Sequence, residues 1–330
     1  MRIALDAMGG DLAPAAIVLG GIEAARIFKD DCEIVFVGDE QQVQNEIDQH
    51  FRTSELNLSI QHAEQKVDMK DSPTIALRQK KNSSISVAMN MHAKKEVDAV
   101  ISAGNTGAAM ATAVKSLGRI NKVLRPAIGT LVPHINGVTL LLDAGANMDC
   151  KPEQLLQFGV MGSIFYNHLF DCEKPRVGLL SIGEEDSKGN SVTIEANKLL
   201  RKSKINFAGN VEGSEVLRGN FDVVICDGFI GNIMVKFAES IDRVYRHTLR
   251  RKIGKKVISQ FGAFLLKPTF DRLRKIFDYQ EYGGAPLLGV QGICIICHGK
   301  STPRAIKNAV REAVKLVREN VNTHIAKELI

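Results

Sequence analysis

The sequence predicts an α/β fold in three layers, with a largely parallel sheet between two layers of helices. Short β-rich runs alternate with helical patterns along almost the whole chain, which is typical of right-handed βαβ units. Aromatic residues make up only 5% of the 330 residues and tryptophan is absent, so the core must be mainly aliphatic. Such a core suits parallel strands, because they are buried on both faces and read as Val, Ile and Leu runs.

The expected elements follow one another closely. The β-rich runs predict strands at Ile3–Asp6, Ile34–Val37, Ala99–Ser102, Ile128–Val132, Val138–Asp143, Val177–Ser181, Asp222–Cys226 and Ile293–Cys297. The helical patterns predict helices at Pro14–Phe28, Ser83–Lys95, Thr106–Leu117, Pro152–His168, Val192–Arg201 and Pro303–Leu329. Pro14, Pro152 and Pro303 each lie near a helix start, where the missing N–H costs nothing.

We expect residues 1–330 to form one domain, because no low-complexity linker, internal repeat or compositional boundary interrupts the chain. The segment Asn232–Tyr282 departs from the alternation, since it contains no convincing strand. We expect a helical protrusion there, over about residues 233–282. Its basic residues surround the apolar run Phe261–Leu266.

This protrusion has two compatible interpretations. One is a helical hairpin with a solvated basic face and a dimer contact. The other is a tip that touches lipid, with apolar side chains in the interface and Lys and Arg against anionic head groups.

Charge and cysteine content narrow the class of partner and the compartment. The net charge of +6 favours an acidic partner, and nucleic acid is the weakest candidate because aromatic residues for base stacking are few. The N-terminus shows no signal-peptide pattern and no run approaches the ~20 apolar residues of a membrane span, so we expect a cytoplasmic protein. Its six cysteines are then expected to be reduced, buried thiols.

The segment Cys294–His298 matches the CxxCH pattern of covalent haem attachment. The run around it is β-rich, however, and side chains three apart on a strand point to opposite faces. We therefore interpret it as a core strand and expect no cofactor.

Five loops rich in Gly, Asp and Asn each follow a predicted strand. Ligands of parallel sheets bind beyond the carboxyl ends of strands, so these loops together predict one site. Singly, each would be read as an ordinary turn. The loops are Asp6–Asp11, Ala103–Gly107, Asp143–Asn147, Ile182–Asn190 and Asp227–Asn232.

The chemistry of these loops favours a small anion. Glycine lets the backbone approach a ligand, and free N–H groups at a helix start attract negative charge. No P-loop and no full GxGxxG is present, so a bare phosphate or a small phosphorylated group is expected. The carboxylates Asp6, Asp11, Asp143 and Asp227 would suit Mg²⁺, but capping of loop N–H groups is the commoner role, and we assign no metal.

A further basic stretch runs from Arg78 to Ser84. Ser83 or Ser84 could cap the next helix. Arg78 and Lys81, just before that helix, could instead hold phosphate or an acidic carrier.

The order of these motifs resembles the bacterial phosphate acyltransferase family over nearly the whole chain. The matching segments are DAMGGD at 6–11, Arg78 with KKNSS at 80–84, SAGNTG at 102–107, DAGAN at 143–147, Lys151–Glu153, 183–190, Gly209–Glu212, DGFIGN at 227–232, Tyr282–Ala285 and His298–Gly299. Ile230, where threonine is frequent, and the Cys294/Cys297 strand depart from the family's commoner pattern.

The resemblance implies an isopropylmalate-dehydrogenase-like fold and a reaction: acyl-ACP and inorganic phosphate give acyl phosphate for phospholipid synthesis. It also implies a homodimer, an acyl carrier protein as partner, and loose peripheral contact with anionic membrane. It implies no nucleotide or metal. A downstream membrane acyltransferase that collects the product is a further candidate partner.

We expect Lys188, Asn232 and His298 to be catalytic. Lys188 and Asn232 would stabilise the oxyanion or the phosphate charge, and His298 would protonate the departing thiolate unless it is a core or capping histidine. The expected substrate-binding residues are Asp6, Gly9, Gly10, Asp11, Arg78, Lys81, Gly104, Asn105, Thr106, Gly107, Asp143, Asn147, Glu184, Asp186, Asp227, Gly228, Gly283 and Gly284.

Two other classes stay open at this point. A β-decarboxylating dehydrogenase would share the architecture, but it needs a nicotinamide site and a metal-binding aspartate cluster. A sensor of acyl groups or phosphate would bind without turnover.

Overall fold

The computed structural model describes residues 1–29, 31–134, 136–254, 257–269, 279–281 and 283–329. Within them the strands form one sheet in the order β3-β2-β1-β4-β11-β10-β5-β6-β9-β7-β8. The strands are β1 (Arg2–Asp6), β2 (Glu33–Gly38), β3 (Leu58–His62), β4 (Ala99–Ser102), β5 (Ala127–His134), β6 (Gly137–Leu142), β7 (Val177–Leu180), β8 (Phe207–Val211), β9 (Val223–Ile225), β10 (Ala285–Leu288) and β11 (Ile293–Ile296).

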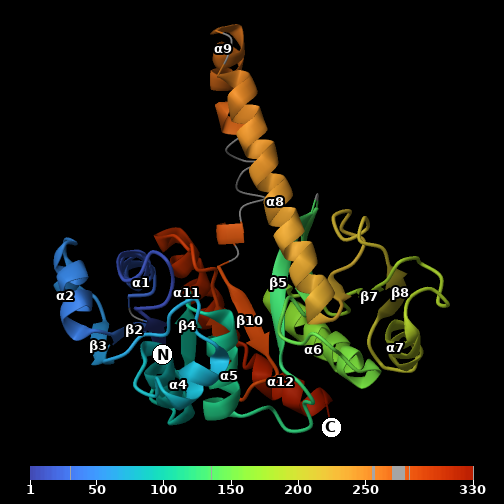
Figure 1. Ribbon diagram of the computed structural model, residues 1–330, viewed down its shortest axis with the longest axis horizontal. Helices are drawn as coiled ribbons and strands as arrows, with labels where there is room; N and C mark the ends of the chain where they lie inside the picture. The colour runs from blue at the N-terminus through green and yellow to red at the C-terminus, as the bar shows by residue number, and fades with distance from the viewer. Residues whose placement is uncertain (30, 135, 255–256, 270–278, 282, 330) are drawn as a thin grey trace.

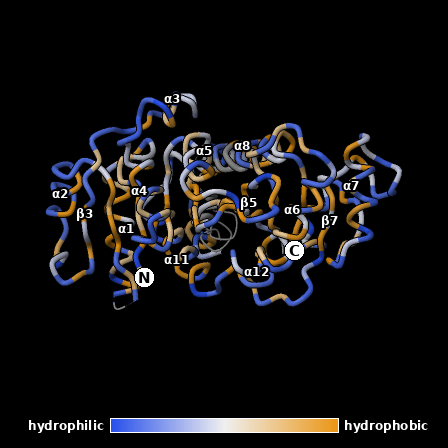
Figure 2. Tube along the Cα trace, turned by 90° about the horizontal axis from the view of Figure 1, so that it is seen from below, coloured by the Kyte–Doolittle hydropathy of each residue, from blue (hydrophilic) through white to orange (hydrophobic). Residues whose placement is uncertain are grey.

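Helices cover both faces of the sheet, which confirms the predicted α/β class (Figures 1 and 2). They are α1 (Ala15–Ile27), α2 (Glu40–Asp48), α3 (Pro73–Arg78), α4 (Ser84–Ala93), α5 (Thr106–Leu117), α6 (Pro152–Phe170), α7 (Ser191–Arg201), α8 (Gly228–Ile253), α9 (Val257–Leu265), α11 (Pro303–Arg318) and α12 (Val321–Glu328), with 3₁₀ turns η1 (Thr53–Glu55) and η2 (Tyr279–Glu281).

Strand alternation divides the core between the two faces. Ile3 and Leu5 pack in the cluster that includes α1 and α11, whereas Ala4 packs in the cluster that includes α4 and α5. Successive side chains of a strand point to opposite faces, so a fully buried strand must be apolar at every position. Aliphatic side chains therefore fill the core on both faces of the sheet.

The sheet reverses direction near its middle, which the sequence did not predict. β5 and β6 form an antiparallel hairpin, and β10 is antiparallel to both β11 and β5. As a result β6, β9, β7 and β8 run opposite to β1, β4 and β11. The five loops that were predicted to form one site at the carboxyl ends of parallel strands therefore do not lie at one edge of the sheet: those after β1 and β4 leave in one direction and those after β6, β7 and β9 in the other.

Most predicted elements are confirmed within a few residues, and one helix is corrected. The predicted helix Pro303–Leu329 is two helices, because Asn320 adopts a left-handed conformation (φ 48°) between α11 and α12. Pro152 and Pro303 occupy the first helical turn as expected, while Pro14 is the cap residue before α1.

The two cysteines of the CxxCH pattern lie on opposite faces of the sheet. Cys294 belongs to one core cluster and Cys297 to the other, and both are buried. Burial raises the pKa of each thiol, to about 12 for Cys294. The core-strand interpretation is therefore confirmed.

Helix α8 protrudes from the rest of the molecule and carries α9 at its far end (Figure 1). The helix begins at Gly228, a turn earlier than the predicted protrusion. Residues 255–256, 270–278 and 282, and the side chains of Arg243, Arg246 and Arg250, lie outside the described residues, so the second arm of the predicted hairpin is not described. Among the described helices none is long and apolar enough to cross a membrane.

Candidate active site

Loops after β1, β4 and β11 pack against one another around Asp6. This carboxylate is buried, and its Oδ2 accepts a 2.6 Å hydrogen bond from the Ser102 hydroxyl. The Gly104 N–H in turn donates to Ser102 Oγ at 3.1 Å. A Cβ on Gly9 would lie 2.5 Å from Asp6 Oδ2, so glycine is required where this loop crosses the carboxylate. Asp6 therefore lies beneath the loops, and its burial raises its pKa.

Gly10 and Asp11 connect this cluster to the loop after β11. Gly10 has a φ of +108°, and a Cβ there would come within 3.0 Å of the carbonyl oxygens of Ala103 and Gly299. The Asp11 N–H donates to the Gly299 oxygen at 2.7 Å, and the side chain of Asp11 is exposed. The sequence thus brings three of its glycine-containing loops into contact.

Helix α5 begins at Thr106 with open backbone donors. Asn105 Oδ1 caps the Ala108 N–H, and the Gly104 N–H is taken by Ser102. The N–H groups of Thr106 and Gly107 have no acceptor among the described residues. Since helix N-termini favour anions, these two amides could hold a small anion, and their role in binding phosphate stays a prediction.

The side-chain amide of Asn105 makes hydrogen bonds to a neighbouring turn. Its Nδ2 donates to the carbonyl oxygens of Met69 at 3.0 Å and Asp71 at 2.9 Å. It therefore holds the 68–71 turn beside the start of α5. The expectation that this side chain binds phosphate gains no support from these contacts.

Lys80 belongs to the KKNSS motif but was not among the predicted site residues, and its ion pairs fix this turn. Its Nζ pairs with Asp71 at 2.5 Å and with Asp68 at 3.3 Å, and the pairing lowers the pKa of Asp71. Lys81 lies just before α4, as expected, whereas Arg78 is the last residue of the short helix α3. Both side chains are exposed and make no ion pair with a described residue. Ser83 occupies the cap position of α4, but its hydroxyl bonds to Ser86 instead.

Asp143 organises the loop after β6. Its Oδ1 accepts the N–H groups of Ile128, Gly145 and Ala146, and its Oδ2 accepts the N–H and the side-chain amide of Asn147. Burial raises its pKa, and these donors oppose the rise. The Asn147 side chain also donates to the Pro126 oxygen at 2.7 Å. These contacts match the capping alternative for Asp143.

The start of α8 packs directly onto that loop. The Gly228 N–H donates to the Asn147 carbonyl oxygen at 2.7 Å, and a Cβ on Gly231 would lie 1.9 Å from the backbone carbonyl oxygen of Asp143. Asp227 caps the first turn through a 2.9 Å bond from the Ile230 N–H. Glycines here allow helix and loop to approach more closely than any other residue could.

This packing brings Asn232 against Gly145. A Cβ on Gly145 would be 3.5 Å from Asn232 Cβ and 3.6 Å from its Cγ. Asn232 is half-buried, and its amide makes no hydrogen bond within the described part of the chain. In contrast to Asn105 and Asn147, it is held in place by packing and keeps its donors available.

Side chains of α7 and β8 hold the loop that follows β7. Asp186 pairs with Arg201 and accepts from Asn197, which lowers its pKa. Asn210 Nδ2 donates to the Glu185 oxygen at 2.8 Å. The side chains of Glu184 and Lys188 are exposed, and Lys188 forms no ion pair with a described residue.

His298 and the glycine pair Gly283–Gly284 lie near the end of β11. His298 Nδ1 accepts the Lys300 N–H at 3.0 Å. Gly283 (φ +85°) packs on α11, where a Cβ would come within 2.6 Å of the Ala309 nitrogen. A Cβ on Gly284 would lie 3.0 Å from Cys297 Sγ. Close packing explains both glycines, and their role in binding substrate stays a prediction.

Glu312 is a buried carboxylate on α11 that the sequence did not single out. Neither of its oxygens has a hydrogen-bond partner among the described residues, and its charge adds to the rise in the pKa of the Cys297 thiol. Burial raises the pKa of Glu312 from 4.5 to about 8.

Stability should therefore fall as the pH rises from about 4.5 to about 8. In this range the folded protein holds the Glu312 proton and the unfolded chain does not, so each pH unit costs at most about 1.4 kcal/mol. Glu312→Gln should reduce this slope in urea unfolding, whereas exposed Glu328→Gln should leave it unchanged. An identical slope in wild type and Glu312→Gln would refute the assignment.

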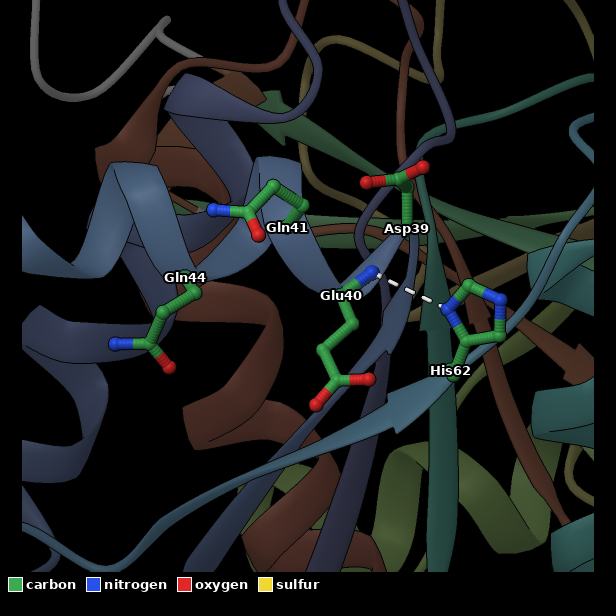
Figure 3. Close-up of a pocket in the computed structure, with 5 residues that line it drawn as sticks. All are labelled: Asp39, Glu40, Gln41, Gln44 and His62. Atoms are coloured by element: carbon green, nitrogen blue, oxygen red, sulfur yellow. Dashed lines mark hydrogen bonds between the residues drawn. The ribbon is translucent and has the colours of Figure 1, made fainter.

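A shallow depression at the β3 edge shows no comparable arrangement (Figure 3). It is lined by Asp39, Glu40, Gln41, Gln44 and His62. The Glu40 N–H donates to His62 Nδ1 at 3.4 Å, while the side chains of Gln41 and Gln44 point away from the histidine. No group of His, Cys, Asp and Glu among the described residues could hold a metal ion.

Comparison with solved structures places the fold among phosphotransacetylases and related α/β enzymes. A phosphotransacetylase from Streptococcus pyogenes superimposes with a TM-score of 0.65 at 14% identity, covering 96% of this chain and 94% of the other. A putative 4-hydroxythreonine-4-phosphate dehydrogenase from Salmonella typhimurium gives 0.55 at 10% identity, covering 96% and 99%. These likenesses show the fold alone.

Relatives found by sequence share a larger fraction of identical residues with this chain. The model of the fatty acid synthesis protein family matches residues 1–324. Phosphate acyltransferases from Pelotomaculum thermopropionicum and Geobacter sulfurreducens are 46% and 44% identical over 329 residues, covering 100% of this chain and 94% of each relative. The chain therefore belongs to the fatty acid synthesis protein family, and its class is that of the acyltransferases.

Proposed function

We propose that this protein transfers a fatty acyl group from acyl-ACP to inorganic phosphate, giving acyl phosphate for phospholipid synthesis in the cytoplasm. The open N–H groups of Thr106 and Gly107 at the start of α5 carry the proposal, because they offer an anion site without a nucleotide-binding motif. Full-length similarity to phosphate acyltransferases supports the acyl chemistry.

In the proposed reaction a phosphate oxygen attacks the thioester carbonyl carbon. A carbon–oxygen bond forms, the carbon–sulfur bond breaks, and the carrier leaves as a thiolate that takes up a proton. Phosphate is already an anion at neutral pH, so positioning matters more than a strong base and can supply up to ~7–11 kcal/mol.

The proposed donors to the oxyanion or the phosphate are the side-chain amide of Asn232 and the ammonium of Lys188. His298 is the proposed proton donor to the thiolate. Incubation with acyl-ACP and phosphate, followed by trapping with hydroxylamine, should yield acyl hydroxamate without added NAD or Mg²⁺. Dependence on either addition would favour a dehydrogenase, and binding without product would favour a sensor.

We further propose that α8 pairs two copies of the chain. Phe229, Ile233, Phe237, Ile241 and Val244 recur every three or four residues and form one apolar stripe. All are more than half exposed, Phe237 by 66% and Val244 by 65%. An exposed stripe of this length favours an interface. Sedimentation equilibrium should give twice the chain mass, and a monomer would contradict the pairing.

The far end of the protrusion is the proposed contact with anionic membrane and with an acidic carrier. Phe261, Phe264, Leu265 and Leu266 are exposed at α9 and just after it. Arg251 and Lys252 at the end of α8 and Lys267 after α9 are exposed as well. Apolar side chains beside basic ones match an interfacial segment. A downstream membrane acyltransferase could collect the acyl phosphate there.

Reversing one charge at this tip should weaken both contacts. Each basic group near an anionic surface contributes about 1 kcal/mol, so Arg251→Glu should reduce partition into anionic liposomes more than tenfold. It should also slow carrier-dependent turnover. Sedimentation with liposomes measures the binding. Lys327→Glu changes an exposed basic residue on α12 and is the control in that assay. Unchanged binding and turnover in Arg251→Glu would contradict the proposed tip.

A further inference from the structure

A cavity of about 490 Å³ lies between α5 and the loop that follows β6. Its size is that of a pocket for a small organic ligand. Met110 and Val114 come from α5, Ala146 and Asn147 from the loop, and Leu124 and Arg125 from the turn before β5. The cavity thus joins elements of the two oppositely directed halves of the sheet.

Among the residues that the structure describes, the lining combines an apolar wall with one cation that makes neither a hydrogen bond nor an ion pair. Met110, Val114, Leu124 and Ala146 form the wall. Arg119, also at the cavity, is occupied, because its guanidinium donates to the carbonyl oxygens of Val123 and Leu124. The exposed guanidinium of Arg125 makes no hydrogen bond or ion pair within the described part of the chain.

Helix α5 connects this cavity to the open amides at its N-terminus. Thr106, Met110 and Val114 are four residues apart, so they follow one side of the helix, rising about 6 Å at each step. A ligand lying along that side would have one end at the amides and the other near Arg125. The guanidinium of Arg125 favours an anionic group at that end of the ligand, and the ligand's reactive group would then lie near Thr106.

We propose that this cavity binds the phosphodiester-linked pantetheine arm of the thioester donor. Arg125 contacts the phosphodiester, the apolar wall contacts the arm, and the thioester carbon lies next to the phosphate proposed at the N–H groups of Thr106 and Gly107. The inference rests on the proposed acyl transfer and names the part of the donor that this surface recognises. Carrier-bound thioesters and free coenzyme A thioesters share the phosphopantetheine part of this arm, which a phosphodiester joins to the carrier and a diphosphate joins to the nucleotide of coenzyme A.

Arg125→Met should raise KM for the donor about tenfold, which is the loss of one charge-assisted contact. The kcat and the KM for phosphate should stay unchanged. Lys122→Met removes the same charge from an exposed residue outside the cavity and should change neither KM. Val114→Phe, which fills the cavity, should raise the donor KM as well, with its Tm reported beside it to show that the fold persists.

Two donors distinguish the phosphodiester from other acidic groups. An equal rise in KM for acyl-ACP and for acyl coenzyme A supports the proposal. A rise with acyl-ACP alone would overturn it, since Arg125 would then contact the carrier protein's surface. An unchanged KM for both donors would overturn it too.

Calorimetry with 4′-phosphopantetheine separates this inference from the proposed reaction, because it needs no turnover. Wild type should bind the free arm and Arg125→Met should bind it about tenfold more weakly. Binding by wild type without turnover would refute the reaction and leave the arm site standing. Equal affinity of the two proteins would refute the arm site, whatever the turnover.

Discussion

Asn232→Ala is expected to lower kcat for acyl transfer by about 10²- to 10³-fold, the effect of removing one preorganised oxyanion donor. The side chain is half-buried against Gly145, and its amide makes no hydrogen bond with any residue that the structure describes. Its geometry is set by α8 packing on the Asp143 loop, so truncation should remove the donor and leave the loops in place. Single-turnover kinetics with acyl-ACP and saturating phosphate measures the effect.

Ser240→Ala is the matched control on the same helix. Its hydroxyl donates to the Lys236 carbonyl oxygen, one turn back, and its loss should not change kcat. Lys188→Ala should also lower turnover, since its ammonium is the second proposed donor. If folded Asn232→Ala and Lys188→Ala proteins kept near-wild-type turnover, the assignment of both donors would be wrong.

Asp143→Ala should give the largest loss of stability, at least about 3 kcal/mol in the free energy of unfolding. The carboxylate accepts four backbone N–H groups and one side-chain amide, at 2.7 to 3.2 Å. Alanine would leave these donors without an acceptor at a buried position, and each such donor costs about 1–3 kcal/mol. Urea unfolding of the two proteins measures the difference.

Asp143→Asn tests the same network more gently. Its oxygen can still accept the N–H groups of Ile128, Gly145 and Ala146, but its amide would face the two donors of Asn147. We expect a loss between zero and that of alanine. Activity should fall in both variants because the loop supports Asn232. A cost below about 1 kcal/mol for alanine would show that the network is not what holds the loop.

Elements with a strong apolar pattern were predicted well, whereas polar and edge elements were missed. Strand β4 and helix α5 have the predicted bounds. Strand β3 is an edge strand of partly exposed residues, β8 contains Gly209 and Asn210, and β10 contains Pro286. Helix α2 buries only Val43 and Ile47. A pattern of burial cannot reveal β3 and α2, because they bury little. Strands β8 and β10 are largely buried, but their Gly, Asn and Pro residues are disfavoured in strands and conceal them in the sequence.

The sequence predicted close approach of backbone within these loops, but neither the two directions in which the loops leave the sheet nor how their polar side chains are used. Glycine positions indicated close approach, and Gly9, Gly228 and Gly231 confirm it. Asn105, Asn147 and Asn232 occupy similar motifs, yet the first two bind carbonyl oxygens of residues 21 to 36 positions away. Those carbonyl groups are located only by the fold, as is the reversed direction of the second half of the sheet.

The central claim is most directly tested by following oxygen-18-labelled phosphate during incubation with acyl-ACP. In the proposed reaction the phosphate oxygen becomes the bridge to the acyl carbon. Mass spectrometry should therefore find acyl phosphate that retains the complete label. Free fatty acid with oxygen from water, and no labelled acyl phosphate, would contradict acyl transfer to phosphate.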